Sequence, residues 1–220
     1  MAAYRSEIIY TPPMVANWAK VLGPARKRDD SDPAKWSIDL LCDPNDEATT
    51  KLRDQIRSFM VEAHGAKPKV SANGMPLKRH EEKNDHGEKE PTGMLVLKAS
   101  RKLENRAQGI ENAPPLVLDS QCNPWPVSEL IGNGSSVIAK VHFWGWSRQG
   151  EGVGLSCELH GVQVIKHVAY NREEPADGGF GVVAGGAVAP QVDPMAEAPM
   201  DSFGQELVAA AQAVEEELPF

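Results

Sequence analysis

The sequence predicts a mainly β protein, a small closed or nearly closed antiparallel barrel with one helix packed on it. Several short segments alternate apolar and polar residues, which is the period-two pattern of half-buried strands. Between two of them, residues 43–65 instead repeat apolar residues at helical spacing. Short strands separated by turns are typical of all-β barrels, a class that often serves as a binding platform.

The expected strands begin at residues 6–10, where Thr11-Pro12-Pro13 ends the pattern and a loop follows. In residues 35–42 the alternation places Trp36 on one face with Ile38 and Leu40, which predicts a core position for this tryptophan. Further strands are expected at 94–102, 116–119, 137–148, 153–160 and 162–170, with a bulge or kink at Gly161. The Gly-rich segment 132–136 precedes a strand and therefore indicates a tight turn.

The helix is expected to start at Asp43, which could cap the free amides, with Pro44 at the first helical position. Gly65 and Pro68 would end it. Its apolar stripe, which should lie on the core, consists of Leu52, Ile56, Phe59, Met60 and Ala63.

Residues 67–91 are highly charged and rich in Gly, Pro and Asn, which favours a long mobile hairpin. His80 and His86 occur there with acidic neighbours, but their spacing matches no pattern that fixes metal ligands, so no metal and no cofactor are expected. The chain also lacks G-x-S-x-G, a Gly-rich phosphate loop and H-E-x-x-H. A non-enzymatic protein is expected, and a weak nuclease using His80, Glu81 and His86 is the last-ranked alternative.

Charge divides the 220-residue chain into two parts. All 23 basic residues lie in residues 1–172, whereas 10 of the 31 acidic residues lie in 173–220, which leaves 21 acids in the first part. We expect a nucleic-acid-binding domain over 1–172, followed over 173–220 by a flexible Gly- and Ala-containing linker and an acidic tail that ends in an aromatic residue. Such a tail could compete with a polyanion for the basic surface.

The redox state and location are also constrained by the sequence. Cys42, Cys122 and Cys157 are odd in number and widely spaced, which favours reduced thiols. There is no signal-peptide pattern and no apolar run that could cross a membrane, so we expect a cytoplasmic protein without membrane contact.

Cations and aromatic residues alternate on the expected strands, and this combination binds single-stranded nucleic acid by stacking bases and contacting phosphates. In residues 137–148, one face carries His142 together with Trp144 and Trp146, which is unusual for a merely solvated face. Either tryptophan could instead pack in the core. The predicted nucleic-acid contacts are Lys98, Arg101, Lys102, Lys140, His142, Trp144, Trp146 and Arg148.

Three motifs together resemble phage single-stranded DNA-binding proteins of the podophage replication type. They are Ile131-Gly132-Asn133-Gly134-Ser135-Ser136-Val137, the strands Gly152-Val153-Gly154-Leu155 and Gly161-Val162-Gln163-Val164, and the acidic aromatic terminus. The terminus Glu215-Glu216-Glu217-Leu218-Pro219-Phe220 is also similar to the acidic Ile-Pro-Phe end of bacterial single-stranded DNA-binding proteins, with Leu in place of Ile.

The resemblance implies a five-stranded, OB-fold-like antiparallel barrel with a capping helix, long loops and a disordered tail. It also implies single-stranded DNA binding in phage replication and recombination, in the host cytoplasm if the protein is phage-encoded. Glu215, Glu216, Glu217, Leu218, Pro219 and Phe220 would recruit a polymerase, helicase/primase or nuclease. A non-enzymatic phage structural or adaptor protein and an RNA-binding OB-fold protein are the alternatives, and homo-oligomerisation is left open.

Overall fold

A computed structural model gives the fold and describes residues 4–27, 29–30, 32–84, 86–105 and 109–170. The chain divides into two units, Met1–Arg172 and Glu173–Phe220. The predicted linker, tail and terminal recruiting segment therefore lie outside the described residues, and the fold below is that of the first unit.

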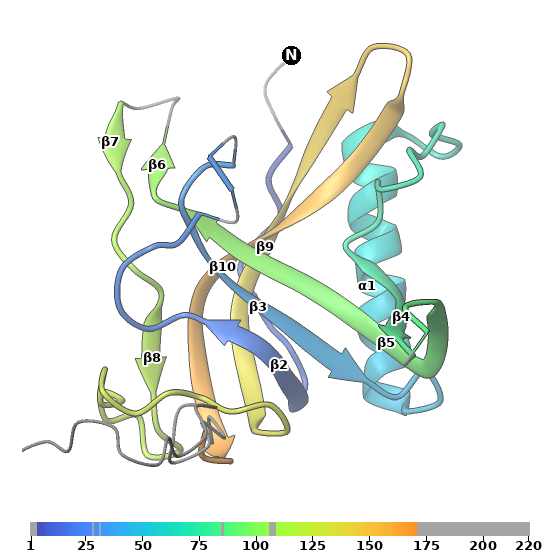
Figure 1. The fold of residues 1–220 in the computed structure, drawn as a ribbon. Helices are drawn as coiled ribbons and strands as arrows, with labels where there is room; N and C mark the ends of the chain where they lie inside the picture. Colours follow the sequence, from blue (N-terminus) through green and yellow to red (C-terminus); the bar gives the residue numbers. More distant parts are fainter. Residues whose placement is uncertain (1–3, 28, 31, 85, 106–108, 171–220) are drawn as a thin grey trace, which may run out of the picture. The chain divides into compact units, whose positions relative to one another are not determined.

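Five strands form a closed barrel, which confirms the predicted OB-like fold (Figure 1). They are β2 (Met14–Lys20), β3 (Lys35–Cys42), β5 (Lys89–Lys102), β9 (Ser136–Arg148) and β10 (Gly152–Lys166). Antiparallel pairing joins β9 to β2, β2 to β3, β3 to β5 and β10 to β9. The ring closes where β5 runs parallel to β10.

Shorter strands extend this ring. β1 (Ile9–Tyr10) pairs with β9, and β8 (Leu116–Leu118) runs parallel to β10. β4 (Leu77–Lys83) forms a hairpin with β5, so the charged segment 67–91 contributes an edge strand to the sheet. β6 (Glu104–Asn105) and β7 (Ile110–Glu111) form a separate two-stranded sheet.

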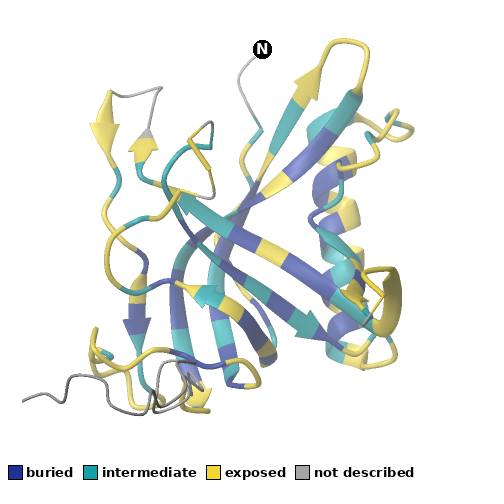
Figure 2. Ribbon diagram, viewed as in Figure 1, coloured by how far each residue is buried: buried dark blue, intermediate teal, exposed yellow. Residues whose placement is uncertain are grey.

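The core lies inside the barrel and beneath the helix α1 (Glu47–His64). Buried and less buried residues alternate along all of β3 and along the first part of β9, as expected for strands with one face on the core (Figure 2). Phe59 of α1 meets Phe143 of β9 with ring centroids 5.7 Å apart, which joins the helix to the barrel. Trp36 is 4% exposed, as predicted, and its Nε1 donates to the Gly23 carbonyl at 2.9 Å.

The apolar stripe of α1 is largely confirmed, since Leu52, Ile56, Phe59 and Met60 are buried, but the predicted helix start is wrong. The helix begins at Glu47, with Asp46 at the N-cap. Asp43 instead accepts a hydrogen bond from the Asn45 amide at 2.8 Å, forming a turn before the helix. A short polar side chain can satisfy local amides in a turn as readily as at a helix end, so the sequence did not distinguish the two.

The first barrel strand also differs from the prediction. Of residues 6–10, only Ile9–Tyr10 forms a strand, and the barrel instead starts with β2, where a loop was expected. The register of β2 on β3 shifts between Asn17 and Lys20, so a bulge breaks the alternation that would have revealed the strand. By contrast, the predicted irregularity at Gly161 is confirmed, as a bulge within the single long strand β10.

Within the residues that the structure describes, no helix is both long enough and apolar enough to cross a membrane.

Candidate nucleic-acid interface

Strands β2, β3 and β5 present one continuous solvent-facing surface, here called the barrel outer face. Because alternate residues point inward, the polar members of each strand share this side. Ser37 of β3 pairs with Lys20 on one side and Ser100 on the other, and Asp39 pairs with Lys98. This is the strand surface that OB barrels use for oligonucleotides.

Lys35 and Lys102 lie directly opposite each other at one end of the barrel outer face. Like charges at such a cross-strand position are destabilising unless something offsets them. Arg26 adds a third cation, since its backbone pairs with that of Lys35 through two 3.0 Å hydrogen bonds. Neither lysine has a carboxylate within ion-pair distance in the described part of the chain, so this end of the face is suited to an anion.

Lys98 occupies the middle of the same face and forms an ion pair with Asp39 at 3.1 Å. The lysine side chain is 63% exposed and that of Asp39 is 23% exposed, so solvent reaches the pair mainly at the lysine. A phosphate could therefore contact the Lys98 ammonium group from the solvent side.

Trp18 supplies the aromatic group of the barrel outer face, and it was missed by the sequence prediction. It is 65% exposed and sits in the β2 bulge with φ of 50°. A positive φ is a genuine outlier for a bulky residue, and such strain concentrates at functional sites. The signal in the sequence is one large aromatic residue inside the short polar stretch Asn17–Lys20, where no core position requires it.

The turn before β9 holds Trp18 in place. Its backbone N–H donates to Asn133 Oδ1 at 2.9 Å, while Ala16 exchanges backbone hydrogen bonds with Gly134 and Ser135 at 2.9 and 2.7 Å. Gly134 has φ of 91°, and a Cβ on Gly132 would lie 2.5 Å from the Val168 carbonyl oxygen. Both glycines are therefore needed for the turn, which confirms the prediction made for segment 132–136.

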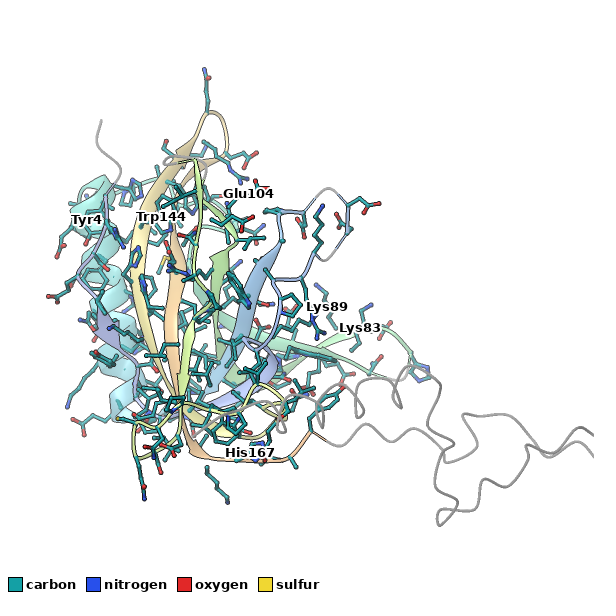
Figure 3. All side chains as sticks on the ribbon, turned by 90° about the vertical axis from the view of Figure 1, so that its left-hand side faces the viewer. Tyr4, Lys83, Lys89, Glu104, Trp144 and His167 are labelled. Atoms are coloured by element: carbon teal, nitrogen blue, oxygen red, sulfur yellow. The ribbon has the colours of Figure 1, made fainter. Side chains whose placement is uncertain are left out.

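A second surface lies on β9, where Lys140 and Trp144 are accessible as predicted. The Lys140 Nζ lies 5.9 Å from the ring centroid of Tyr10, which is 67% exposed. Trp144 is 42% exposed, and Figure 3 shows it on the same side as Tyr4, whose carbonyl accepts from the Gly145 amide at 3.0 Å. This surface also combines cations with aromatic rings.

Trp146 and Arg148 lie near the end of the β9–β10 hairpin and contact each other. The guanidinium carbon of Arg148 is 5.2 Å from the Trp146 ring centroid, a cation–π contact. The indole also packs on Gly154, where a Cβ would lie 2.4 Å from the ring. The indole is half-buried, and base stacking on the ring face near Arg148 would require Arg148 to move.

Two of the predicted contacts, His142 and Arg101, belong to a polar cluster in which His142 is buried and Arg101 is partly buried. His142 is 1% exposed, and its ring lies 4.7 Å from that of His160. The N-terminal segment covers His142, because Arg5 Nε donates a hydrogen bond to His142 Nε2 at 3.0 Å. Arg101 forms an ion pair with Glu158 at 3.1 Å. His142 lies on the strand face that was expected to be outward, but Arg5 covers it, whereas Arg101 lies on the same side of its strand as Ala99.

Burial is the largest cause of the altered titration in this cluster. It lowers the pKa of His142 to about 4, and the charges of Arg5 and Arg101 and a protonated His160 add to the effect. The pKa of His160 is also lowered, by burial and then by Arg101, Arg5 and Lys140. Both imidazoles are neutral at pH 7, so one ring donates to the other through the His142 Nδ1 and His160 Nε2 contact.

The structure therefore sorts the eight predicted residues into four pairs. Lys98 and Lys102 share the barrel outer face, Lys140 and Trp144 share the β9 surface, and Trp146 contacts Arg148 near the hairpin end. Arg101 and His142 lie in the buried cluster.

Comparison with known proteins identifies related folds. A family model described as "Enterobacter phage Enc34, ssDNA-binding protein" matches residues 8–170. Comparison with curated protein sequences gives no match.

Three solved structures illustrate the structural likeness. The chain is similar to gp2.5, a single-stranded DNA binding protein encoded by bacteriophage T7, with 17% identity and a TM-score of 0.53 over 84% of this chain and 99% of that chain. It is also similar to the single-stranded DNA-binding protein from bacteriophage Enc34 in complex with ssDNA, with 17% identity and a TM-score of 0.56 over 74% of this chain and 88% of that chain. A C-terminal truncation of the Enc34 protein matches with 19% identity and a TM-score of 0.55, again over 74% of this chain and 88% of that chain. These likenesses show the fold.

The buried cluster predicts a specific pH dependence of stability. His142 titrates near pH 4 when folded, against about 6.5 when unfolded, so the unfolded chain binds more protons between these values. The free energy of unfolding should therefore fall as pH falls from about 6.5 towards 4, with a His142 contribution on the order of 2 kcal/mol. Urea unfolding at several pH values should show a weaker dependence in a His142→Gln variant, and an identical dependence in both proteins would contradict this role of His142.

Proposed function

Because the chain belongs to the family of the single-stranded DNA-binding protein of Enterobacter phage Enc34, we propose that it binds single-stranded DNA with little sequence preference. It would coat exposed strands during phage replication or recombination and perform no chemistry of its own. The observation that carries the proposal is the barrel outer face, where the exposed Trp18 lies on the same surface as Lys20, Lys35, Lys98 and Lys102.

Each component of this face has a separate role in binding. The lysine pair Lys35 and Lys102 neutralises phosphates, and DNA relieves the repulsion between the two ammonium groups. The indole of Trp18 stacks on a base, an interaction that tolerates any sequence because every base has a π-face. Contacts with the DNA phosphates and stacking on the bases together give affinity without selecting a particular base.

The β9 surface extends the path of the strand. Lys140 can contact a phosphate, and Trp144 with Tyr10 offers further stacking area. Trp146 and Arg148 lie near the end of the hairpin between the last two barrel strands, a loop that OB barrels also use for ligands. We assign them a secondary role, because each already contacts the other.

The acidic segment 173–220 supplies a regulatory and a recruiting function in this proposal. Its ten carboxylates compete with DNA phosphates for the basic surface, and attachment to the same chain gives them a high effective concentration. Its end, Leu218-Pro219-Phe220, recruits replication enzymes, because an apolar tip adds nothing to phosphate mimicry. Both roles are inferred from the sequence.

Binding should be strongest for single-stranded DNA and should weaken as the salt concentration rises. Each phosphate that the protein neutralises should contribute about −0.7 to the slope of log K plotted against log salt concentration. In a Lys35→Gln/Lys102→Gln variant, the salt slope should fall by about 1.4. Fluorescence titrations with single-stranded DNA, duplex DNA and RNA at two salt concentrations measure both effects. Equal or tighter binding of RNA would favour an RNA-binding protein, and absence of binding to all three would favour the adaptor alternative.

Replacing Trp18 with alanine should weaken binding by about 1–3 kcal/mol, because one stacked base is lost. Tyr170→Ala is the matched control, since this aromatic residue is also exposed but lies beyond the end of β10 and does not belong to β2, β3 or β5. Trp144→Ala measured alongside tests the β9 surface. Full affinity in a folded Trp18→Ala protein would show that the stacking position has been misassigned.

Removing residues 173–220 should tighten binding of single-stranded DNA at low salt, because the competing carboxylates are lost. Deleting Phe220 alone keeps all ten carboxylates, so it should leave DNA affinity unchanged while preventing capture of the replication polymerase in a pull-down. Unchanged affinity after the larger deletion would exclude self-competition, and polymerase capture without Phe220 would exclude recruitment through the tip.

A further inference from the structure

A pocket of about 500 Å³ lies between α1 and the β4–β5 hairpin, away from the Trp18 bulge. Its volume is within the range of small-molecule sites. Arg53 and Arg57 line it from the helix, and Lys78 and Arg79 line it from β4. Its apolar lining includes Ile56 and Leu77. Figure 1 shows β4 and the first part of β5 beside α1.

The charges in this pocket are poorly compensated. Arg53 Nε is buried and has no hydrogen-bond partner among the described residues, and its nearest recorded carboxylate is that of Asp54, at 4.0 Å. The same carboxylate already accepts from Arg57 at 3.2 Å. Arg79 has no ion pair within the described part of the chain. A buried donor without a partner is costly, so the pocket is suited to an anion that would supply the missing acceptor.

The pocket is reached from the barrel outer face around the edge of the sheet. Lys78 pairs with Val96, so it lies on the same side of the sheet as Lys98, two residues further along β5. Arg79 pairs with Leu95 and points to the opposite side, where α1 lies. In the described sheet, β4 pairs with β5 alone, which leaves the other edge of β4 open for a strand to pass.

We propose that this pocket is a second nucleotide subsite, which takes a phosphate and its neighbouring base from single-stranded DNA that has passed over Lys98 and Lys78. Arg53 and Arg79 bind the phosphate, because guanidinium groups match phosphate geometry with two parallel hydrogen bonds. Ile56 and Leu77 contact the sugar or base. An acidic peptide is also negatively charged, but it has no phosphodiester backbone that places a charge at every unit between the pocket and the lysines of the barrel outer face.

The inference rests on the proposed function and predicts that the pocket affects long strands alone. In the full chain, Arg53→Gln/Arg79→Gln should weaken binding of an oligothymidylate of about 16 nucleotides by about tenfold, and should leave one of about 6 nucleotides unaffected. The salt slope for the long strand should fall by about 1.4, for two phosphate interactions. The control is Lys51→Gln/Lys67→Gln, which removes the same charge from exposed positions outside the pocket. Its effect on affinity should not depend on the length of the oligonucleotide.

Four results would overturn the inference. Equal losses on both lengths would indicate a general electrostatic effect, and no loss on either would show that DNA does not use the pocket. In a third outcome, the free peptide Glu-Glu-Glu-Leu-Pro-Phe binds the unmodified chain and not the double variant, while DNA binding is the same in both. That result would assign the pocket to an acidic peptide. If the unmodified chain bound neither oligonucleotide, the proposed function itself would fail, and the inference with it. Arg79→Gln alone, at an exposed position, should reproduce part of the length-dependent loss if the double variant is unstable.

Discussion

Closure of the barrel between β5 and β10 is the constraint on which the rest of the structure depends. Cys157 lies opposite Ala99 and Glu158 opposite Ser100 in this short parallel pairing, while long antiparallel pairings form the neighbouring parts of the ring. Arg101 leaves the pairing just beyond Ser100 and contacts both Glu158 and His160. The cluster thus stabilises the end of this parallel pairing, and it contains two of the residues predicted to contact DNA.

Closure also separates apolar from polar side chains around the ring. Inward residues such as Ile38, Leu97 and Phe143 fill the core, so their strand neighbours are presented to solvent at fixed spacing. On the barrel outer face, this spacing puts Lys35 opposite Lys102 and Asp39 opposite Lys98. The repulsive lysine pair and the strained, exposed tryptophan both reduce the stability of the fold. Both are consistent with a surface that binds DNA, because phosphates would neutralise the lysines and a base would stack on the indole.

Period-two alternation made β3, β9 and residues 94–102 of β5 predictable, together with the core position of Trp36, and the glycine itself indicated the bulge at Gly161. It failed for β2, because the bulge around Trp18 interrupts the pattern and local periodicity cannot describe it. Lys98 and Lys102 were identified correctly as outward cations, whereas His142 was misjudged, because burial by Arg5 and His160 depends on contacts between distant segments. The orphaned Arg53 Nε likewise depends on how α1 packs beside β4.

The central claim is that bases stack on Trp18, and the indole N–H signals of the five tryptophans test it most directly. In a nuclear magnetic resonance titration of the 15N-labelled chain with oligothymidylate, the Trp18 signal should shift progressively to saturation. The Trp36 signal should stay in place, because its N–H is bonded to the Gly23 carbonyl in the core. A Trp18 signal that does not move while the chain binds DNA would contradict the account.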